Sequence, residues 1–261
     1  MLRAFSTAAT GMHAQETKVN VIANNLANIN TSGFKKSQLD FQDLMYLHVT
    51  SPASETDAGT QTPTGLEVGN GVRVASSLKV FTQGELENTG RPLDMAIQGD
   101  GFFKVATPNG DRYTRDGAFR VDANGDLVTA SGYRLEPGIT IPADWKTISI
   151  GANGTVSVVS GTSSEAQQVG KISLVRFPNS SGLNSEGDNL YSWSAAAGSA
   201  VEADPMTSGL GSIRQGMRER SNVQMVDELV NMIMAQRAYE INSRAIKAGD
   251  EMLTTANQLM R

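Results

Sequence analysis

Cysteine is absent from this 261-residue chain, and histidine occurs only twice. The absence of cysteine excludes disulfide bonds and thiolate metal ligands. His13 and His48 lie far apart in the sequence, so we interpret both as surface residues rather than as zinc ligands. The chain therefore has few of the side chains that bind transition metals.

Aromatic residues are also scarce, at 6% of the chain, and the formal net charge is −5. No run of Lys and Arg is present, which argues against a nucleic-acid partner. No apolar run is long enough to cross a bilayer, so we expect no membrane insertion. The first residues lack the apolar core of a secretory signal peptide. A location outside the cytoplasm would therefore require another export route.

Both ends of the chain carry an apolar residue at every seventh position. The N-terminal seam consists of Phe5, Met12, Val19 and Leu26. The C-terminal seam consists of Met225, Met232, Tyr239, Ile246, Leu253 and Met260, joined by Leu229 from a second, mostly polar row. That second row continues through Gln236, Ser243, Asp250 and Asn257. A seven-residue apolar repeat is the pattern by which helices pack along a supercoil.

The repeats predict a helix over residues 1–32 and a second helix that begins with Ser221 or Asn222 as its N-cap. Gly33 is expected to end the first helix in a left-handed conformation. The C-terminal stripe is narrow, because its second row is mostly polar, so it buries too little surface to hold a long helix alone. We expect the seams to bind helices of neighbouring subunits. The alternative is an ordinary helical hairpin within a monomer.

The middle of the chain has a different composition. Residues 38–46 are compatible with a strand or a short helix. Residues 48–71, rich in Ser, Thr, Pro and Gly, predict an extended loop or a segment that orders only on contact. Over residues 72–177, short alternating runs are separated by turns such as Asn109-Gly110 and Asn124-Gly125. Such dipeptides between alternating runs predict β-hairpins. Residues 178–217 are expected to be loop-rich.

These elements predict an α+β fold in which long N- and C-terminal helices pair as a coiled-coil-like layer. Between them lies a central all-β domain of the twisted sandwich or barrel-like type. The expected domains are residues 1–36 with 218–261 for the helical layer, 37–74 for an extended insertion and 75–217 for the β domain.

No convergent set of catalytic side chains can be assembled from the sequence. The run Asp122–Asp126 lacks the glycine and glutamate of a calcium loop, so we interpret it as a hairpin turn. Asp94 and Asp100 are interpreted as turn-capping residues rather than a catalytic pair, although Asp94, Asp100 and Asp116 are the acids that an enzyme would have to use. The prediction is a protein with no catalytic residues, no cofactor and no metal.

Three blocks of sequence resemble the flagellar axial proteins, the family of rod, hook and hook-associated subunits. ANNLANINTSGFKK (23–36) and SNVQMVDELVNMIMAQRAYEINSRAI (221–246) resemble its N- and C-terminal signatures. GRPLDMAIQGDGFFKV (90–105) and YTRDGAFRVDANGDLVTASGYRL (113–135) are similar to the shared β domain. The signature residues are Asn24, Asn25, Leu26, Ala27, Asn28, Gly33, Phe34, Gln236, Arg237, Ala238, Tyr239 and Glu240.

Within this family the chain is too short for the outer domain of a hook subunit, yet it has the β domain that the shortest proximal rod subunits lack. Residues 44–74 and 187–191 resemble the distal-rod type. The resemblance implies a structural subunit of the basal-body distal rod, which polymerises as an open helix into a rigid, hollow drive shaft that carries torque from motor to hook. The alternatives are a proximal rod or hook-type axial subunit and, in a different class, a peptidoglycan-acting or glycan-binding β-domain protein.

The resemblance also implies partners and a location. Further copies of the chain, the proximal rod and hook proteins, the surrounding L/P-ring bushing and the flagellar export apparatus would contact the subunit. The rod would span the periplasm, and its subunits would be exported without a cleavable signal peptide.

Overall fold

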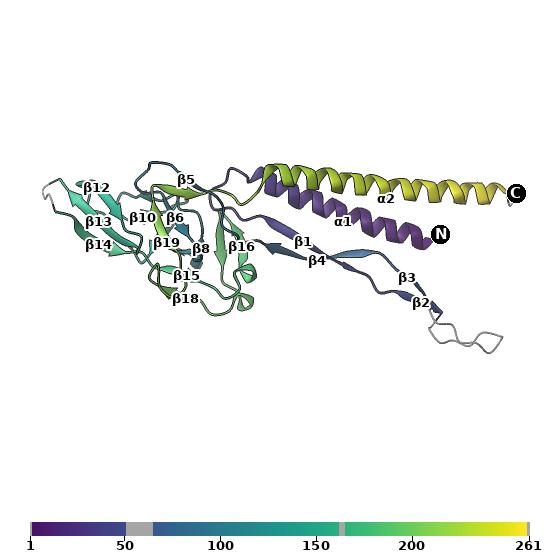
Figure 1. Cartoon of the computed structure of the whole chain (residues 1–261), viewed down its shortest axis with the longest axis horizontal. Coiled ribbons are helices and arrows are strands. Elements are labelled where there is room, and N and C mark those ends of the chain that lie inside the picture. Colours follow the sequence, from purple (N-terminus) through teal and green to yellow (C-terminus); the bar gives the residue numbers. More distant parts are fainter. Residues whose placement is uncertain (1, 51–64, 162–164, 260–261) are drawn as a thin grey trace. The chain divides into compact units, whose positions relative to one another are not determined.

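A computed structural model describes residues 2–50, 65–161 and 165–259. Within these residues the chain divides into two compact units. The helical unit contains the chain as far as Leu26, Ser37–Leu78 and the chain from Gln224, whereas the β unit contains Ala27–Lys36 and Lys79–Val223. The predicted α+β class is confirmed, with long terminal helices and a central region of strands (Figure 1).

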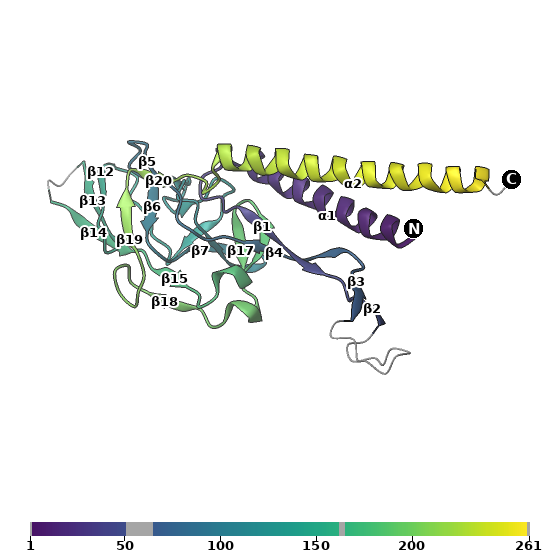
Figure 2. The ribbon, with the colours of Figure 1, turned by 45° about the vertical axis from the view of Figure 1, so that its right-hand side comes forward.

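Helices α1 (Leu2–Ala27) and α2 (Met225–Leu259) lie side by side and antiparallel in the helical unit (Figures 1 and 2). A Cβ added to Gly249 would lie 2.7 Å from Cε1 of Phe5, and one added to Gly11 would lie 2.9 Å from Nδ2 of Asn242. Each glycine therefore accepts a large side chain from the other helix. Neither of these helices is long and apolar enough, over the residues described, to cross a membrane.

The first helix ends at Ala27, so the predicted helix over residues 1–32 is too long. Beyond it, the Thr31 N–H and hydroxyl group donate to the backbone and side-chain oxygens of Asn28, at 3.1 Å each. Local bonds of this kind compete with helical hydrogen bonds. Gly33 has the expected left-handed conformation, with φ of 68°, but it lies in the turn that follows rather than at the helix end.

The predicted N-cap of the second helix is also wrong, because α2 begins at Met225 rather than after Ser221 or Asn222. The Asn222 side chain is used elsewhere. Its Oδ1 accepts the Lys36 N–H at 2.8 Å, and its amide donates to the Val80 oxygen at 2.8 Å. Asn222 therefore connects strand-bearing segments of the β unit instead of capping a helix.

The segment after the first turn forms an antiparallel ribbon, here called the β arm. Strand β1 (Ser37–Asp43) pairs with β4 (Val72–Lys79), and β2 (Leu47–Thr50) pairs with β3 (Leu66–Val68). Residues 38–46 are thus mainly strand, and the loop predicted over 48–71 is wrong where β2 and β3 lie. Leu47 pairs with Val68 across the ribbon despite the Ser- and Pro-rich composition around them. Residues 51–64 of that prediction lie outside the described residues.

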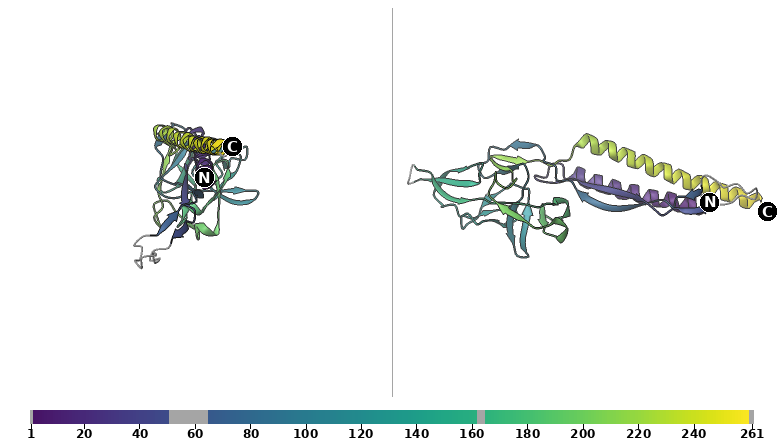
Figure 3. Two further views of the ribbon diagram at one scale, coloured as in Figure 1. Left: turned by 90° about the vertical axis from the view of Figure 1, so that its right-hand side faces the viewer. Right: turned by 60° about the horizontal axis from the view of Figure 1, so that its bottom comes forward.

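The β arm runs along α1 (Figure 3, right), and hydrogen bonds fix it to the helix at two points. The Asn25 amide group donates to the Ser37 oxygen and accepts the Ser37 N–H, both at 2.9 Å. Further along, the Val72 N–H donates to Oγ1 of Thr10 at 3.4 Å. The helix thereby fixes the direction in which the arm leaves it.

Short strands make up most of the β unit. In chain order they are β5 (Leu86–Asn88), β6 (Met95–Gln98), β7 (Phe103–Thr107), β8 (Gly110–Thr114), β9 (Arg120–Val121), β10 (Leu127–Val128), β11 (Arg134–Glu136), β12 (Trp145–Ile150), β13 (Thr155–Ser160), β14 (Gln167–Lys171), β15 (Leu174–Arg176), β16 (Asn184–Gly187), β17 (Leu190–Ser192), β18 (Val201–Ala203), β19 (Ser212–Gln215) and β20 (Met217–Glu219). Single helical turns lie at η1 (Ser180–Gly182) and η2 (Ala195–Ala197). Within residues 178–217 the strands β16 to β19 and the first residue of β20 are short and separated by loops, so the expected loop-rich character is confirmed.

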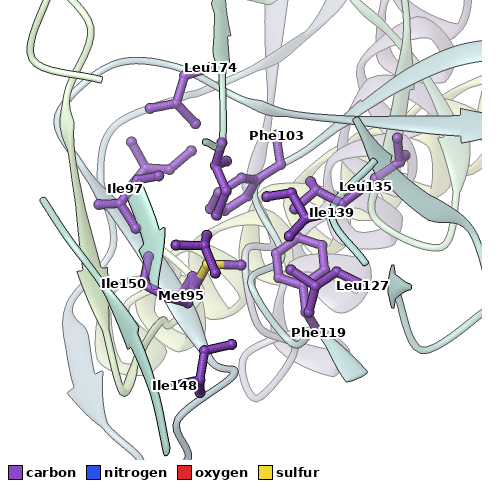
Figure 4. Close-up of a cluster of buried hydrophobic side chains, with 14 of the residues drawn as sticks. Met95, Ile97, Phe103, Phe119, Leu127, Leu135, Ile139, Ile148, Ile150 and Leu174 are labelled. Atoms are coloured by element: carbon purple, nitrogen blue, oxygen red, sulfur yellow. The ribbon is translucent and has the colours of Figure 1, made fainter. Parts of the chain in front are cut away.

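Seven of these described strands form an antiparallel sheet in the order β16-β17-β8-β7-β11-β10-β9, while β12, β13 and β14 form a smaller one. Side chains from both sheets converge on one core, in which Met95, Phe103 and Leu127 are fully buried (Figure 4). The turn at Asn109-Gly110 joins β7 to β8 and that at Asn124-Gly125 joins β9 to β10, as predicted. The Asp122 side chain accepts the Asn124 and Asp126 N–H groups, so this run is the expected hairpin turn.

Candidate assembly surfaces

The seam residues occupy two kinds of environment in the helical unit. The half-buried ones are Phe5, Met12, Val19, Leu26, Met232, Ile246 and Leu253. Met225, Leu229 and Tyr239 are exposed, and Met260 lies outside the described residues. The seam is thus partly covered by helix pairing within the chain and partly open to solvent.

A row of small and polar residues completes the α1-facing side of α2. Glu228, Ala235 and Gly249 are buried along it, and Asn242 packs against Gly11. This row lies one position before the second row expected from the sequence, Leu229 to Asn257. The signal for this row was Ala235 and Gly249, fourteen residues apart, because small residues allow two helices to approach closely.

A groove of about 380 Å³ lies between the two helices. Its lining residues are Glu16, Val19 and Asn20 from α1 and Gln236, Tyr239 and Glu240 from α2. Three of these are signature residues, and Tyr239 and Val19 also belong to the seam. Of the other signature residues on α2, Arg237 forms an ion pair with Glu240 at 3.3 Å and Ala238 is half-buried.

The side of α2 turned away from α1 carries a second apolar stripe, here called the outer face. Its large apolar residues are Val226, Val230, Ile233, Met234, Ile241 and Met252, each at least half exposed. Arg237 and Arg244 are exposed between them. The search for a seven-residue repeat missed this stripe, which follows the spacing of three and four residues typical of one helix face.

The N-terminal signature residues lie at the end of α1 and in the turn that follows it. Asn25 holds the start of the β arm, as described above, while Asn24 and Ala27 are exposed at the end of α1. In the β unit, Phe34 is buried, and the ammonium group of Lys79 lies 4.7 Å from the centre of its ring. The Gly33 N–H donates to the backbone oxygen of Glu219 at 2.8 Å.

Beside this turn is a cluster of buried charges, Lys35, Arg115 and Glu219, which sequence reasoning missed. The side chains of Lys35 and Glu219 are fully buried, and Lys35 Nζ donates to Glu219 Oε1 at 2.6 Å. Arg115 Nη1 donates to Glu219 Oε2 at 3.4 Å. Lys35 Nζ also donates to the Thr82 oxygen at 2.7 Å, and Glu219 Oε1 accepts the Gly84 N–H at 2.8 Å.

One carboxylate thus serves two buried cations. Burial lowers the pKa of Lys35 below its usual value, because the ammonium group loses its hydration, while Glu219 opposes that shift. Burial also disfavours the charged form of the neighbouring Tyr191 phenol, which raises its pKa. The carboxylate is the group that makes burial of both cations tolerable. The cluster joins residues just after α1 to residues just before α2.

An exposed apolar helix face, an exposed ribbon and a groove between paired helices define a structural subunit made to contact other protein chains. Comparison with known proteins gives the particular family. Family descriptions match at residues 5–35 (flagella basal body rod protein), 96–158 (flagellar hook protein FlgE/F/G D1 domain) and 214–259 (flagellar basal body rod FlgEFG protein C-terminal).

Relatives match over the whole length of the chain. The flagellar basal-body rod protein FlgG of Borreliella burgdorferi is 44% identical over 264 residues, covering all of both chains. The FlgG proteins of Caulobacter vibrioides and Bacillus subtilis are 43% and 40% identical, with at least 99% of each chain covered. The chain belongs to the flagellar basal-body rod family and is a structural subunit of the distal rod, as its sequence predicted.

Proposed function

We propose that this subunit polymerises helically into a rigid, hollow drive shaft that spans the periplasm and acts by assembly rather than catalysis. The helical layer (1–36 and 218–261) would line the tube, the β domain (75–217) would form its outside and the insertion (37–74) would lie between neighbouring subunits. The observation that carries the proposal is the outer face of α2, because one chain leaves these large apolar side chains in water.

The partners follow from this arrangement. Further copies would extend the rod through heterologous contacts, which grow without closing. Proximal rod and hook proteins would continue the axis at either end, and the L/P-ring bushing would surround the β domains. The export apparatus would deliver each subunit to the growing tip.

Tyr239 is the seam residue best placed to test assembly, since it is 44% exposed and lines the groove. Tyr239→Asp would put a charge where a neighbouring helix must lose water. The expected result is at least a tenfold loss of sedimentable rods, with β content by circular dichroism unchanged. Asn231→Asp, at an exposed position of the same helix, is the matched control and should assemble normally. Loss of the β signal in Tyr239→Asp would instead make the helices part of the core.

Residues 44–74, within the β arm, are proposed to stiffen the rod together with the terminal seam, by wedging between neighbouring subunits. Met45, Val49 and Leu66 expose apolar side chains on the arm, which supports contact with another chain. Deletion of residues 48–68 is expected to leave filaments that form but bend, with a persistence length several-fold shorter in electron micrographs. Filaments as stiff as the unmodified rod would exclude this role for the arm.

Export is proposed to require an unfolded subunit. Fusing a stable, fast-folding domain to the chain should therefore reduce its secretion at least tenfold in a flagellated strain. The same domain carrying a destabilising core substitution provides the control and should restore secretion. Equal secretion of both fusions would show that the channel accepts folded cargo.

A further inference from the structure

The outer face of α2 is a second packing surface on a helix that already has one. At about 100° per residue, its apolar side chains and two arginines fall within roughly a third of the helix circumference, opposite the side that packs on α1. Val226 is 72% exposed and Ile241 65%, near the two ends of the stripe. A helix that is apolar on two opposite faces has to bury both to be stable in water.

The groove between α1 and α2 has the complementary character. Val19 and Tyr239 provide apolar surface in it, and Glu16 and Glu240 provide carboxylates. Glu16 is 63% exposed and therefore accessible, whereas Glu240, 52% exposed, already forms an ion pair with Arg237 of its own chain. The outer face of α2 offers the complementary groups, because the positively charged Arg244 is exposed beside apolar residues such as Ile241. Apolar contact and opposite charge therefore coincide.

We propose that the outer face of α2 in one copy docks into the α1–α2 groove of a second copy. This rests on the proposed function and names the surface through which the rod extends. Gln236 and Glu240, which line the groove, lie roughly 110° and 70° round α2 from the centre of the outer face. One copy can bind one neighbour through its outer face and another through its groove. The contact is therefore heterologous and open-ended.

The cysteine-free chain makes a direct test possible. Full-length Ile241→Cys and a size-tagged Asn20→Cys chain are mixed, assembled, oxidised and separated by size. The expected product is the heterodimer of these two variants, at least tenfold above the yield with Asn231→Cys, a control on another flank of α2. Two results would overturn the docking but leave the proposed function intact. One is that the Ile241→Cys chain forms only homodimers. The other is that the thiol introduced at position 241 still reacts with maleimide in sedimented rods. Unmodified chains that never form rods would overturn both.

Exchange of charges gives a second readout. Arg244→Glu and Glu16→Arg are each expected to reduce the assembled fraction several-fold, and the double variant should recover to within twofold of the unmodified chain. Positions 16 and 244 of the same chain are too far apart for the two exchanged charges to pair with each other. The packing of Phe5 on Gly249 and of Gly11 on Asn242 places Glu16 roughly 10 Å along the axis from Arg244. A double variant no better than the single ones would contradict pairing between copies.

Discussion

Replacing Glu219 by glutamine is expected to lower the free energy of unfolding of the β unit by about 3–5 kcal/mol. Glutamine keeps the shape of the side chain but removes its charge, so Lys35 and Arg115 lose the one carboxylate that both contact. The loss is large compared with the total stability of a typical domain, about 5–15 kcal/mol. The β unit should therefore become one of marginal stability.

Urea unfolding followed by tryptophan fluorescence measures this effect, because both tryptophans, Trp145 and Trp193, lie in the β unit. Glu85→Gln is the control. Glu85 faces Arg220 at 3.8 Å with its side chain 81% exposed, so its replacement should leave the midpoint unchanged. Adding Lys35→Met to Glu219→Gln should recover part of the loss. A Glu219→Gln midpoint equal to that of the unmodified chain would mean that water reaches the cluster.

Local signals in the sequence predicted much of this fold. The seven-residue repeats identified both terminal helices, and Asn-Gly dipeptides identified hairpins such as the one between β7 and β8. These signals are readable because periodicity and turn chemistry depend on residues a few positions apart. Family resemblance then added what no spacing could show, the assembly to which the subunit belongs.

Features fixed by distant contacts could not be predicted in this way. Asn222 has the chemistry of an N-cap, but Lys36, Val80 and Thr82 use its side chain. The buried charge cluster draws on three separate regions of the sequence, and nothing local marks Lys35 as different from the neighbouring Lys36. The outer face of α2 was readable in principle, yet its arginines concealed it from a search for uninterrupted apolar rows.

The signature residues also divide into two groups that the sequence could not separate. Gln236, Tyr239 and Glu240 line the groove, where other chains can reach them. Asn25 and Gly33 instead bind backbone groups of their own chain. We infer that the N-terminal signature chiefly sets how the chain turns after α1, whereas the C-terminal signature contributes to the assembly surface.

Gly33→Ala tests the first half of that division and should destabilise the β unit by about 3–4 kcal/mol. The left-handed backbone, with φ of 68°, accounts for about 1 kcal/mol of this, since a side chain there strains the main chain. The remainder comes from contact, because a Cβ at Gly33 would lie 2.6 Å from the Asp116 nitrogen and 2.7 Å from the Arg115 carbonyl carbon. These atoms belong to one backbone peptide group, which has little freedom to relax.

Gly90→Ala separates the two causes. Gly90 has nearly the same φ, 66°, and no atom of the described residues lies within 4 Å of an added Cβ, so only the cost of about 1 kcal/mol should appear in its urea midpoint. Because the Gly33 N–H binds the Glu219 backbone oxygen, Gly33→Ala should also disturb the charge cluster. Combined with Glu219→Gln, its effect should then be less than additive. Equal losses for Gly33→Ala and Gly90→Ala would show that the signature glycine is required only for its conformation and not for the close approach of the turn to Arg115 and Asp116.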